Sequence, residues 1–242
     1  MQHFIFLHGF LGSQQDWYAV VTQLSNVKCH CLDLPGHGAN HHIQISDFAE
    51  SAIWLSKQIQ QLVGQAPYYL IGYSLGGRLA AYFATQTITP VHNLQKVVLE
   101  GANLGLTSQI ERELRWQNDT MWAEQFATRP IRQVLQDWYQ QPVFADLSES
   151  QLQALINIRA NNQPTALSQM LLATSLAKQP DLWQQIQVQP EKFYYFCGAN
   201  DEKFRQLAEK HQLNLTLIEK VGHNAHVHQP IAFATKLAAL LC

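Results

Sequence analysis

Charged side chains are scarce in this chain of 242 residues. Asp, Glu, Lys and Arg together make up 14% of it, whereas a typical soluble protein has about a quarter. The formal net charge is only −2, so the composition offers no basic surface for nucleic acid. We attribute the remaining surface polarity to Gln and Asn, and we expect no nucleic-acid partner.

Cysteine is also rare, with four residues at Cys29, Cys31, Cys197 and Cys242. Cys29 and Cys31 lie two positions apart on an expected strand, so both sulfurs should point to one face. A zinc site would need two more ligands nearby, and the sequence offers none. We therefore expect buried free thiols, a reducing compartment and no bound metal.

Long apolar runs are missing too. The N-terminal run Phe4–Leu7 is too short for a signal peptide, and no basic segment precedes it. No stretch approaches the roughly 20 apolar residues that cross a bilayer. The sequence thus predicts a soluble, cytoplasmic protein without a membrane partner, long enough for one large α/β domain with an insertion.

Apolar runs of strand length alternate with helical patterns along much of the chain. Strands are expected at 4–7, 27–32, 68–72, 96–100, 192–197 and 215–219, and helices at 14–24, 48–63 and 230–241. This alternation is typical of a mostly parallel sheet with helices on both faces. The predicted fold class is therefore α/β.

The strand pattern disappears between Leu104 and about Gln189. Helices are expected there at 108–118, 121–127, 130–139, 149–161 and 165–177. The stretch follows the fourth strand, at the carboxyl edge where α/β proteins bind ligands. We predict a core made of residues 1–103 and 190–242, and a helical cap, or lid, made of residues 104–189.

The segment Gly72-Tyr73-Ser74-Leu75-Gly76 has the spacing G-x-S-x-G between an expected strand and an expected helix. In that context the pattern is typical of a sharp turn that raises a serine above the sheet. Glycine is required on both sides because a Cβ would clash across the bend. A strand–helix turn that merely contains a serine is the alternative, and the partners found downstream weigh against it.

A serine hydroxyl needs a base to take its proton, and the base is usually a histidine. We choose His223, which follows the sixth strand in Gly222-His223-Asn224-Ala225-His226. The nearby His226 and His228 compete with it.

The histidine in turn needs an acid that orients it. Asp201 follows the fifth strand, and we prefer it to Glu100, at the end of the fourth strand, and to Glu202. The chain order Ser74, Asp201, His223 is that of the α/β hydrolases.

A negative oxygen formed beside Ser74 needs backbone donors. We assign this oxyanion hole to the amides of Leu75 and of Phe10, which lies in the loop after the first strand. Each donor would stabilise a transition state by roughly 3 kcal/mol. His8 is expected to brace that loop, and Asp33, Gly36, His37 and Gly38 to shape a neighbouring turn.

The expected cap is rich in arginine, which suits bidentate binding of carboxylates. Its arginines are Arg112, Arg115, Arg129, Arg132 and Arg159, and Arg78 opens the helix after the serine. Any one of them is more often an ordinary solvated residue. Trp138, Tyr139 and Phe144 could line a pocket, although aromatic residues usually belong to a core.

Four segments together resemble the α/β-hydrolase family: His8-Gly9-Phe10-Leu11-Gly12, Leu34-Pro35-Gly36-His37-Gly38, the serine turn, and Gly222 to His226. More closely, the chain is similar to the 2-succinyl-6-hydroxy-2,4-cyclohexadiene-1-carboxylate synthases (MenH) of menaquinone biosynthesis. This closer resemblance covers nearly the whole chain and includes the cap segments 137–144, 159–162 and 173–177.

The resemblance implies a lyase that needs no cofactor and eliminates pyruvate from a small polycarboxylate substrate. Ser74, His223 and Asp201 would abstract a proton, and the Phe10 and Leu75 amides would hold the enolate. The implied substrate-binding residues are Tyr73, Arg78, Arg115, Arg159, Trp138 and Phe144, with Arg112 as the alternative to Arg115.

Two other functions stay open. An esterase, thioesterase or C–C bond hydrolase could use the same triad and oxyanion donors. A ligand receptor without catalysis is disfavoured because all three triad residues are present. We expect a monomer.

Overall fold

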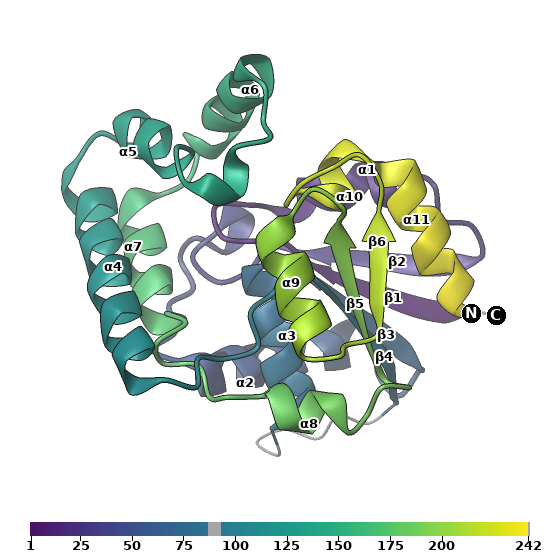
Figure 1. Ribbon diagram of the computed structural model, residues 1–242. Helices are drawn as coiled ribbons and strands as arrows, with labels where there is room; N and C mark the ends of the chain where they lie inside the picture. Colours follow the sequence, from purple (N-terminus) through teal and green to yellow (C-terminus); the bar gives the residue numbers. More distant parts are fainter. Residues whose placement is uncertain (87–92, 242) are drawn as a thin grey trace.

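A six-stranded parallel sheet forms the centre of the protein in the computed structural model, which describes residues 1–86 and 93–241 (Figure 1). The strands are β1 (Gln2–Leu7), β2 (Val27–Leu32), β3 (Tyr68–Tyr73), β4 (Leu94–Glu100), β5 (Phe193–Gly198) and β6 (Leu215–Ile218). Their order is β2-β1-β3-β4-β5-β6, and every neighbouring pair is parallel. The predicted α/β class is confirmed.

Helices cover both faces of this sheet (Figure 1). One face packs against α2 (Phe48–Val63), α3 (Leu75–Thr85), α8 (Trp183–Gln187) and α9 (Glu202–Lys210). The other packs against η1 (Gln14–Trp17), α1 (Tyr18–Val21), α10 (Ala225–His228) and α11 (Pro230–Ala238), which η4 (Ala239–Leu241) follows. Successive side chains of β1 alternate between the two cores, as a strand between two helical layers requires.

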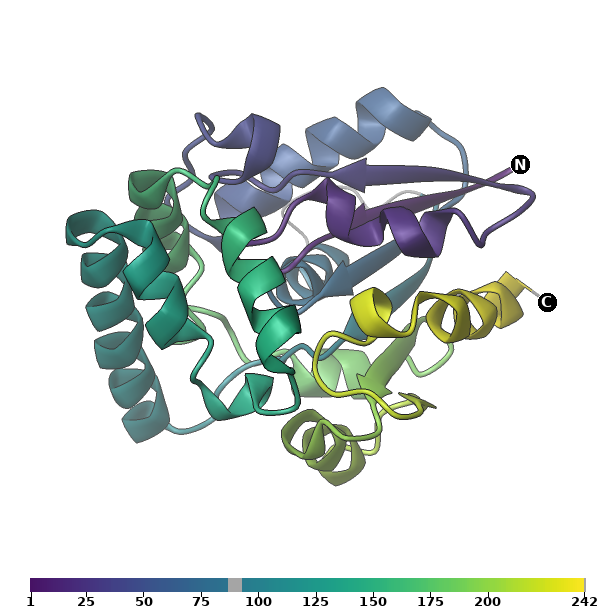
Figure 2. The same ribbon diagram turned by 90° about the horizontal axis from the view of Figure 1, so that it is seen from above.

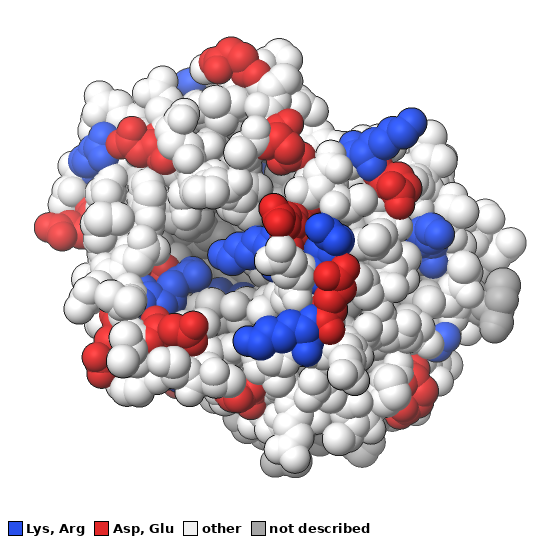
Figure 3. Space-filling view, in the orientation of Figure 1, with Lys and Arg blue, Asp and Glu red and all other residues white. Residues whose placement is uncertain are grey.

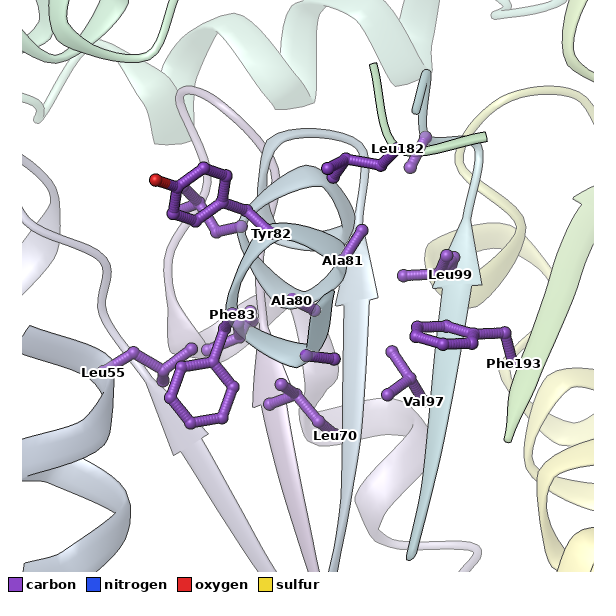
Figure 4. Close-up of a cluster of buried hydrophobic side chains, with 14 of the residues drawn as sticks. Leu55, Leu70, Ala80, Ala81, Tyr82, Phe83, Val97, Leu99, Leu182 and Phe193 are labelled. Atoms are coloured by element: carbon purple, nitrogen blue, oxygen red, sulfur yellow. The ribbon is translucent and has the colours of Figure 1, made fainter. Parts of the chain in front are cut away.

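Helix α3 passes through the larger core (Figure 4). Its small residues Ala80 and Ala81 are fully buried, while Phe83 packs with Leu55 of α2 and Leu70 of β3. Burying each Leu or Phe side chain contributes roughly 2 kcal/mol. This packing fixes the start of α3, where the candidate nucleophile lies.

Between β4 and β5 the chain forms a helical segment beside the carboxyl edge of the sheet (Figure 2). It contains α4 (Gln109–Thr128), α5 (Ile131–Trp138), η3 (Pro142–Phe144), α6 (Glu149–Arg159) and α7 (Pro164–Ala173) before α8. These helices share a separate apolar cluster, which includes Phe126, Leu135 and Leu167 and also Leu11 from the loop after β1.

Some expected helices have different bounds. Residues 108–118 and 121–127 form the single helix α4, because Asp119 is buried and its carboxylate binds Arg115 and Ser175. Tertiary bonding thus overrides the weak helix propensity of Asn118, Asp119 and Thr120. Helix 14–24 is shorter than expected, helix 165–177 ends at Ala173, and α8, α9 and α10 were not predicted.

The cysteine prediction is confirmed in part. Cys29, Cys31 and Cys197 are free thiols, but only Cys197 is buried. Cys29 and Cys31 are half-buried because β2 lies at the edge of the sheet. Desolvation raises the pKa of Cys29 to about 11 and that of Cys31 to about 12. Cys242 lies outside the described residues.

Neither a cluster of metal-binding side chains nor a membrane-spanning helix is present in residues 1–86 and 93–241. Within these ranges, no group of three or more His, Cys, Asp or Glu side chains is arranged to hold a metal ion. No helix in the same ranges is long and apolar enough to cross a membrane.

Candidate active site

Ser74 occupies a strained turn between β3 and α3. Its φ of 49° and ψ of −108° are unfavourable for any residue with a Cβ. A Cβ on Gly76 would lie 2.4 Å from the Leu7 carbonyl oxygen, and one on Gly72 would lie 2.4 Å from the Gly76 oxygen. The amide of Gly76 donates to the His8 oxygen at 3.1 Å. Glycine therefore lets α3 approach β1 and expose the serine.

His223 and Asp201 form a buried pair on the loops after β6 and β5. His223 Nδ1 lies 2.7 Å from Asp201 Oδ2, and each side chain is only 5% exposed. The other oxygen of Asp201 accepts the Phe204 amide at 3.3 Å and caps α9. These bonds fix the His223 ring, so its Nε2 is the nitrogen available to a reacting group.

Ser74 and His223 meet at the backbone of Gly101. The Ser74 amide donates to the Glu100 oxygen at 2.8 Å. A Cβ on the adjacent Gly101 would lie 2.7 Å from His223 Cε1. Within the described residues no hydrogen bond joins the Ser74 hydroxyl to His223. Catalytic hydrogen bonds of this kind often tighten only when substrate binds.

The other acids and histidines considered for the triad bind other partners. Glu100 is fully buried and binds His226, whose Nδ1 lies 2.8 Å from Glu100 Oε2 and whose amide donates to Oε1 at 3.0 Å. Glu202 accepts from Gln206, and His228 contacts Gln151. Asp201 is the acid that the structure brings to His223.

The two predicted oxyanion donors face no competing acceptor. In the part of the chain that the structure describes, neither the Phe10 amide nor the Leu75 amide donates a hydrogen bond. Leu75 is the first residue of α3, where amides lack helical partners. Both amides are therefore free to stabilise a negative oxygen beside Ser74.

Two buried histidines hold the loop that carries Phe10. His8 Nε2 accepts the Leu34 amide at 3.0 Å, and its Nδ1 donates to the Gly9 oxygen at 2.7 Å. His37 Nε2 accepts the Leu11 amide at 3.1 Å. Burial lowers the pKa of His8 to about 4 and that of His37 to about 3, so both rings are neutral near pH 7. His8 thus has the bracing position expected of it.

Asp33 stabilises the neighbouring turn, which contains η2 (Gly38–Asn40). Its carboxylate accepts the amides of Gln14 at 2.7 Å and Ala39 at 2.9 Å. A Cβ on Gly38 would collide with this carboxylate at 2.4 Å. The bonds place Asp33 at the turn, away from the triad.

A small aromatic pocket adjoins the oxyanion loop. Phe10, Tyr73, Trp138, Tyr139 and Phe144 line it, with Asp16, Arg159, Asn224 and His226 among its polar residues. The Phe144 ring lies 6.1 Å from the His223 ring, and Trp138 lies 5.3 Å from Phe10. The Tyr73 hydroxyl donates to Asn224, so its ring is the part left to contact a ligand.

Arg159 binds Asp16 through two hydrogen bonds of 2.9 and 2.8 Å. Arg78 is buried in α3 and donates to Gln179 Oε1 and to the Thr174 oxygen. Desolvation, together with the charge of Arg115, lowers the pKa of Arg78 to about 9. Both arginines link the core to the helical segment.

Arg112 and Arg115 lie one turn apart on α4 but have different partners. Arg112 Nη1 donates to the carbonyl oxygens of Ala177 and Gln179. Arg115 binds Asp119 through Nε at 2.7 Å, which leaves its two terminal nitrogens without a bond to any described residue. Arg129 pairs with Asp137 and Arg132 with Asn157, apart from the aromatic pocket.

A hollow lies between the helical segment and the core, and Lys and Arg side chains reach its lower and right-hand rims, with Asp and Glu side chains close by (Figure 3). It lies beside the carboxyl edge of the sheet, where Ser74, His223 and the oxyanion loop are located. A shaped, cationic hollow next to a nucleophile and two free amides suits a small anionic substrate.

Comparisons with known proteins agree with this geometry. A family model described as alpha/beta hydrolase fold matches residues 2–230. The chain belongs to the alpha/beta hydrolase fold family. Several curated relatives align over nearly the whole chain, the helical segment included.

The putative 2-succinyl-6-hydroxy-2,4-cyclohexadiene-1-carboxylate synthase of Haemophilus influenzae is 44% identical over 237 residues, covering 98% of this chain and 96% of the relative. The synthase of Yersinia pseudotuberculosis serotype O:1b is also 44% identical, with 86% of its length covered. This α/β hydrolase therefore closely resembles the named synthases.

Solved structures give the same family assignment. MenH from S. aureus superposes with a TM-score of 0.88 at 25% identity, covering 99% of this chain and 93% of that one. A malate-bound thermophilic esterase from Thermogutta terrifontis has a TM-score of 0.81 at 18% identity, over 100% and 89% of the two chains. The second likeness shows the shared fold alone.

Sequence reasoning missed two residues of this α/β-hydrolase site, Asp16, which holds Arg159, and Asn224, which accepts the Tyr73 hydroxyl. It considered Glu100 only as a rival acid and missed its partner, His226. Asp16 could not be linked to Arg159 by spacing, since 143 positions separate them. The GHNAH motif did contain Asn224 and His226, but no local pattern showed their partners.

Proposed function

We propose that this protein is a 2-succinyl-6-hydroxy-2,4-cyclohexadiene-1-carboxylate synthase, a carbon–oxygen lyase of menaquinone biosynthesis. It eliminates pyruvate from 2-succinyl-5-enolpyruvyl-6-hydroxy-3-cyclohexene-1-carboxylate. The observation that carries this proposal is the 44% identity to the named synthase over 96% of that relative. The buried His223–Asp201 pair beside Ser74 supports it.

The proposed reaction begins with removal of the proton α to the succinyl ketone. His223 accepts the Ser74 hydroxyl proton, and the Ser74 oxygen takes the carbon-bound proton. The electrons of that C–H bond form an enolate, which accepts hydrogen bonds from the Phe10 and Leu75 amides. When the enolate collapses, a new double bond forms in the ring and the existing ring double bond moves by one position. This shift of electrons breaks the C–O bond to the enolpyruvyl group. The His223 imidazolium then gives up its proton to the methylene carbon of the leaving enolate, which becomes pyruvate, and the neutral base is restored.

Asp201 stabilises the imidazolium of His223 during this transfer. Its 2.7 Å contact with Nδ1 keeps the proton on that nitrogen and leaves Nε2 facing the reaction. The neutral His8 and His37 hold the Phe10 loop without adding a charge that would compete with the enolate.

The proposed substrate carries three carboxylates, and the hollow is lined by cations. We assign substrate binding to Arg78, Arg115 and Arg159, with Tyr73, Trp138 and Phe144 as the surrounding aromatic walls. Arg115 is preferred to Arg112 because its terminal nitrogens have no bond to described residues, whereas Arg112 binds two carbonyl oxygens. Residues 104–189 form the proposed cap over a core made of 1–103 and 190–242.

The remaining features belong to the same proposal. The reaction requires no cofactor, and its partner is the small polycarboxylate. We propose a cytoplasmic monomer that binds neither nucleic acid nor membrane.

The decisive experiment measures pyruvate release from the enolpyruvyl substrate with a coupled reductase assay. The wild type should release pyruvate, and Ser74→Ala should lower kcat by at least about 1000-fold, because the proton relay is lost. Ser150→Ala, at an exposed position of α6, is the matched control and should keep normal turnover.

Normal turnover by Ser74→Ala would contradict the mechanism. Hydrolysis of p-nitrophenyl esters without release of pyruvate would instead indicate the esterase, thioesterase or C–C hydrolase alternative.

A further inference from the structure

Three cationic side chains near the candidate site come from separate helices. Arg78 comes from α3, Arg115 from α4 and Lys203 from α9. Desolvation and then the positive charge of Arg115 lower the pKa of both Arg78 and Lys203, and the Asp201 carboxylate partly offsets this effect on Lys203. The positive charge of Arg115 thus disfavours the charged forms of the other two side chains. Lys203 was not among the residues singled out in the sequence.

Lys203 lies beside the candidate base. It is the second residue of α9, two positions after Asp201. Its ammonium lies 5.4 Å from the centroid of the Phe204 ring. The same ring stacks on the His223 imidazole, with centroids 4.8 Å apart and planes at 22°. One aromatic ring therefore separates the Lys203 charge from the proposed proton relay.

The carboxylates nearest to Lys203 in the chain bind other groups. Asp201 uses one oxygen for His223 and the other for the Phe204 amide. Glu202 accepts from Gln206 at 2.9 Å. Among residues 1–86 and 93–241 no acidic side chain forms an ion pair with Lys203.

Two arginines of the site region do have acidic partners. Arg159 is paired with Asp16, and Arg205, on the same helix as Lys203, is paired with Glu209 at 3.4 Å. Clustering unneutralised cations raises the free energy of the empty site, and an anion bound among them offsets that cost. The cluster therefore has the charge pattern of a carboxylate subsite.

We propose that Lys203 is a substrate-binding residue, which holds a carboxylate of the substrate from the core side of the hollow while Arg115 holds it from α4. This assignment rests on the proposed function, because it takes the polycarboxylate as the ligand. Lys203, on α9, thus joins the cations that α3 and the helical segment supply. The carboxylate would lie next to His223 and thus orient the substrate for proton abstraction.

The test compares Lys203→Met, Lys203→Arg and Lys210→Met. Methionine keeps the apolar stem but removes the charge. We expect Lys203→Met to lower kcat/KM by about 10- to 100-fold, mainly through KM, as loss of a charge-assisted hydrogen bond predicts. Lys203→Arg should recover to within about 3-fold. Lys210→Met changes an exposed lysine in the last turn of the same helix and should match the wild type.

Thermal unfolding of each variant separates binding from structure. The proposal requires that Lys203→Met unfold at the same temperature as Lys210→Met. It is overturned if kcat/KM stays within 2-fold of the wild type. It is also overturned if the loss lies in kcat alone, or if Lys203→Arg recovers nothing.

Failure of the proposed function is recognised separately, by a wild type that releases no pyruvate. In that case calorimetric titration with citrate, a small tricarboxylate, decides about Lys203. Affinity at least 5-fold weaker in Lys203→Met than in Lys210→Met supports a carboxylate subsite. Equal affinity in the two variants overturns it.

Discussion

Ser74 illustrates how a single residue carries both strain and chemistry. Its backbone has φ 49°, and the structure fixes it through the Ser74 amide bond to the Glu100 oxygen and the Gly76 amide bond to the His8 oxygen. Strain of this kind costs on the order of 1–3 kcal/mol. The fold thus loses stability at the position where the proposed nucleophile must be exposed.

Replacing Ser74 with glycine should therefore stabilise the protein while abolishing activity. Glycine adopts positive φ without a Cβ clash, whereas alanine keeps the clash. We expect Ser74→Gly to exceed Ser74→Ala by about 1 kcal/mol in the free energy of unfolding. Urea denaturation of the two variants measures the difference, and equal stability would argue against a strained turn.

At the scale of elements, the loop between β1 and η1 depends on neutral histidines. His8 and His37 each use one ring nitrogen as the acceptor for a backbone amide, which a protonated ring could not do. Because burial lowers both pKa values below the ordinary 6.5, the folded protein binds fewer protons than the unfolded chain. The contribution of these two histidines to the free energy of unfolding is therefore present above about pH 6.5 and is lost as the pH falls.

The free energy of unfolding should decrease between about pH 6.5 and pH 4. Each of the two histidines contributes a slope of roughly 1.4 kcal/mol per pH unit in that range. Chemical denaturation at pH 7, 6 and 5 tests this. His8→Gln should remove about half of the slope, and His42→Gln, an exposed control, should leave it unchanged. A constant stability from pH 7 to 5 would refute the assignment.

Predictability also differed between elements. The strands were located to within about two residues because continuous apolar runs bounded by turn residues have few other conformations available. Helix α4 was broken in two by the prediction, since Asn118, Asp119 and Thr120 are weak helix formers. Only the distant Ser175 hydroxyl, 2.7 Å from Asp119, shows why that segment stays helical.

For the whole molecule, the contact between the core and the helical segment contains a buried ion pair. Asp16 in η1 and Arg159 in α6 are about one-tenth exposed and are joined by two hydrogen bonds. Asn162 adds a bond of 2.9 Å to the Leu11 oxygen. The pair thus ties the helical segment to the oxyanion loop and places Arg159 at the aromatic pocket.

Removing one partner of this ion pair should lower the free energy of unfolding more than replacing both partners with apolar residues. Asp16→Asn leaves Arg159 buried without a counter-charge and should destabilise the protein by about 3 kcal/mol. The double variant Asp16→Leu with Arg159→Met should recover most of that stability, yet stay impaired in substrate binding. Denaturation and pyruvate-release kinetics on the same samples measure both effects. A double variant less stable than Asp16→Asn would contradict the expectation.

The sequence by itself determined the parallel α/β architecture and the positions of Ser74, Asp201 and His223 along the chain. Periodic apolar residues and short glycine motifs are local signals, and local sterics suffice to interpret them. Only the tertiary structure decided that Glu100 belongs to His226, that Asp16 holds Arg159, and that the Lys203 ammonium lies over the ring that stacks on His223. These pairings depend on distances between residues far apart in the chain, which close packing sets and spacing does not encode.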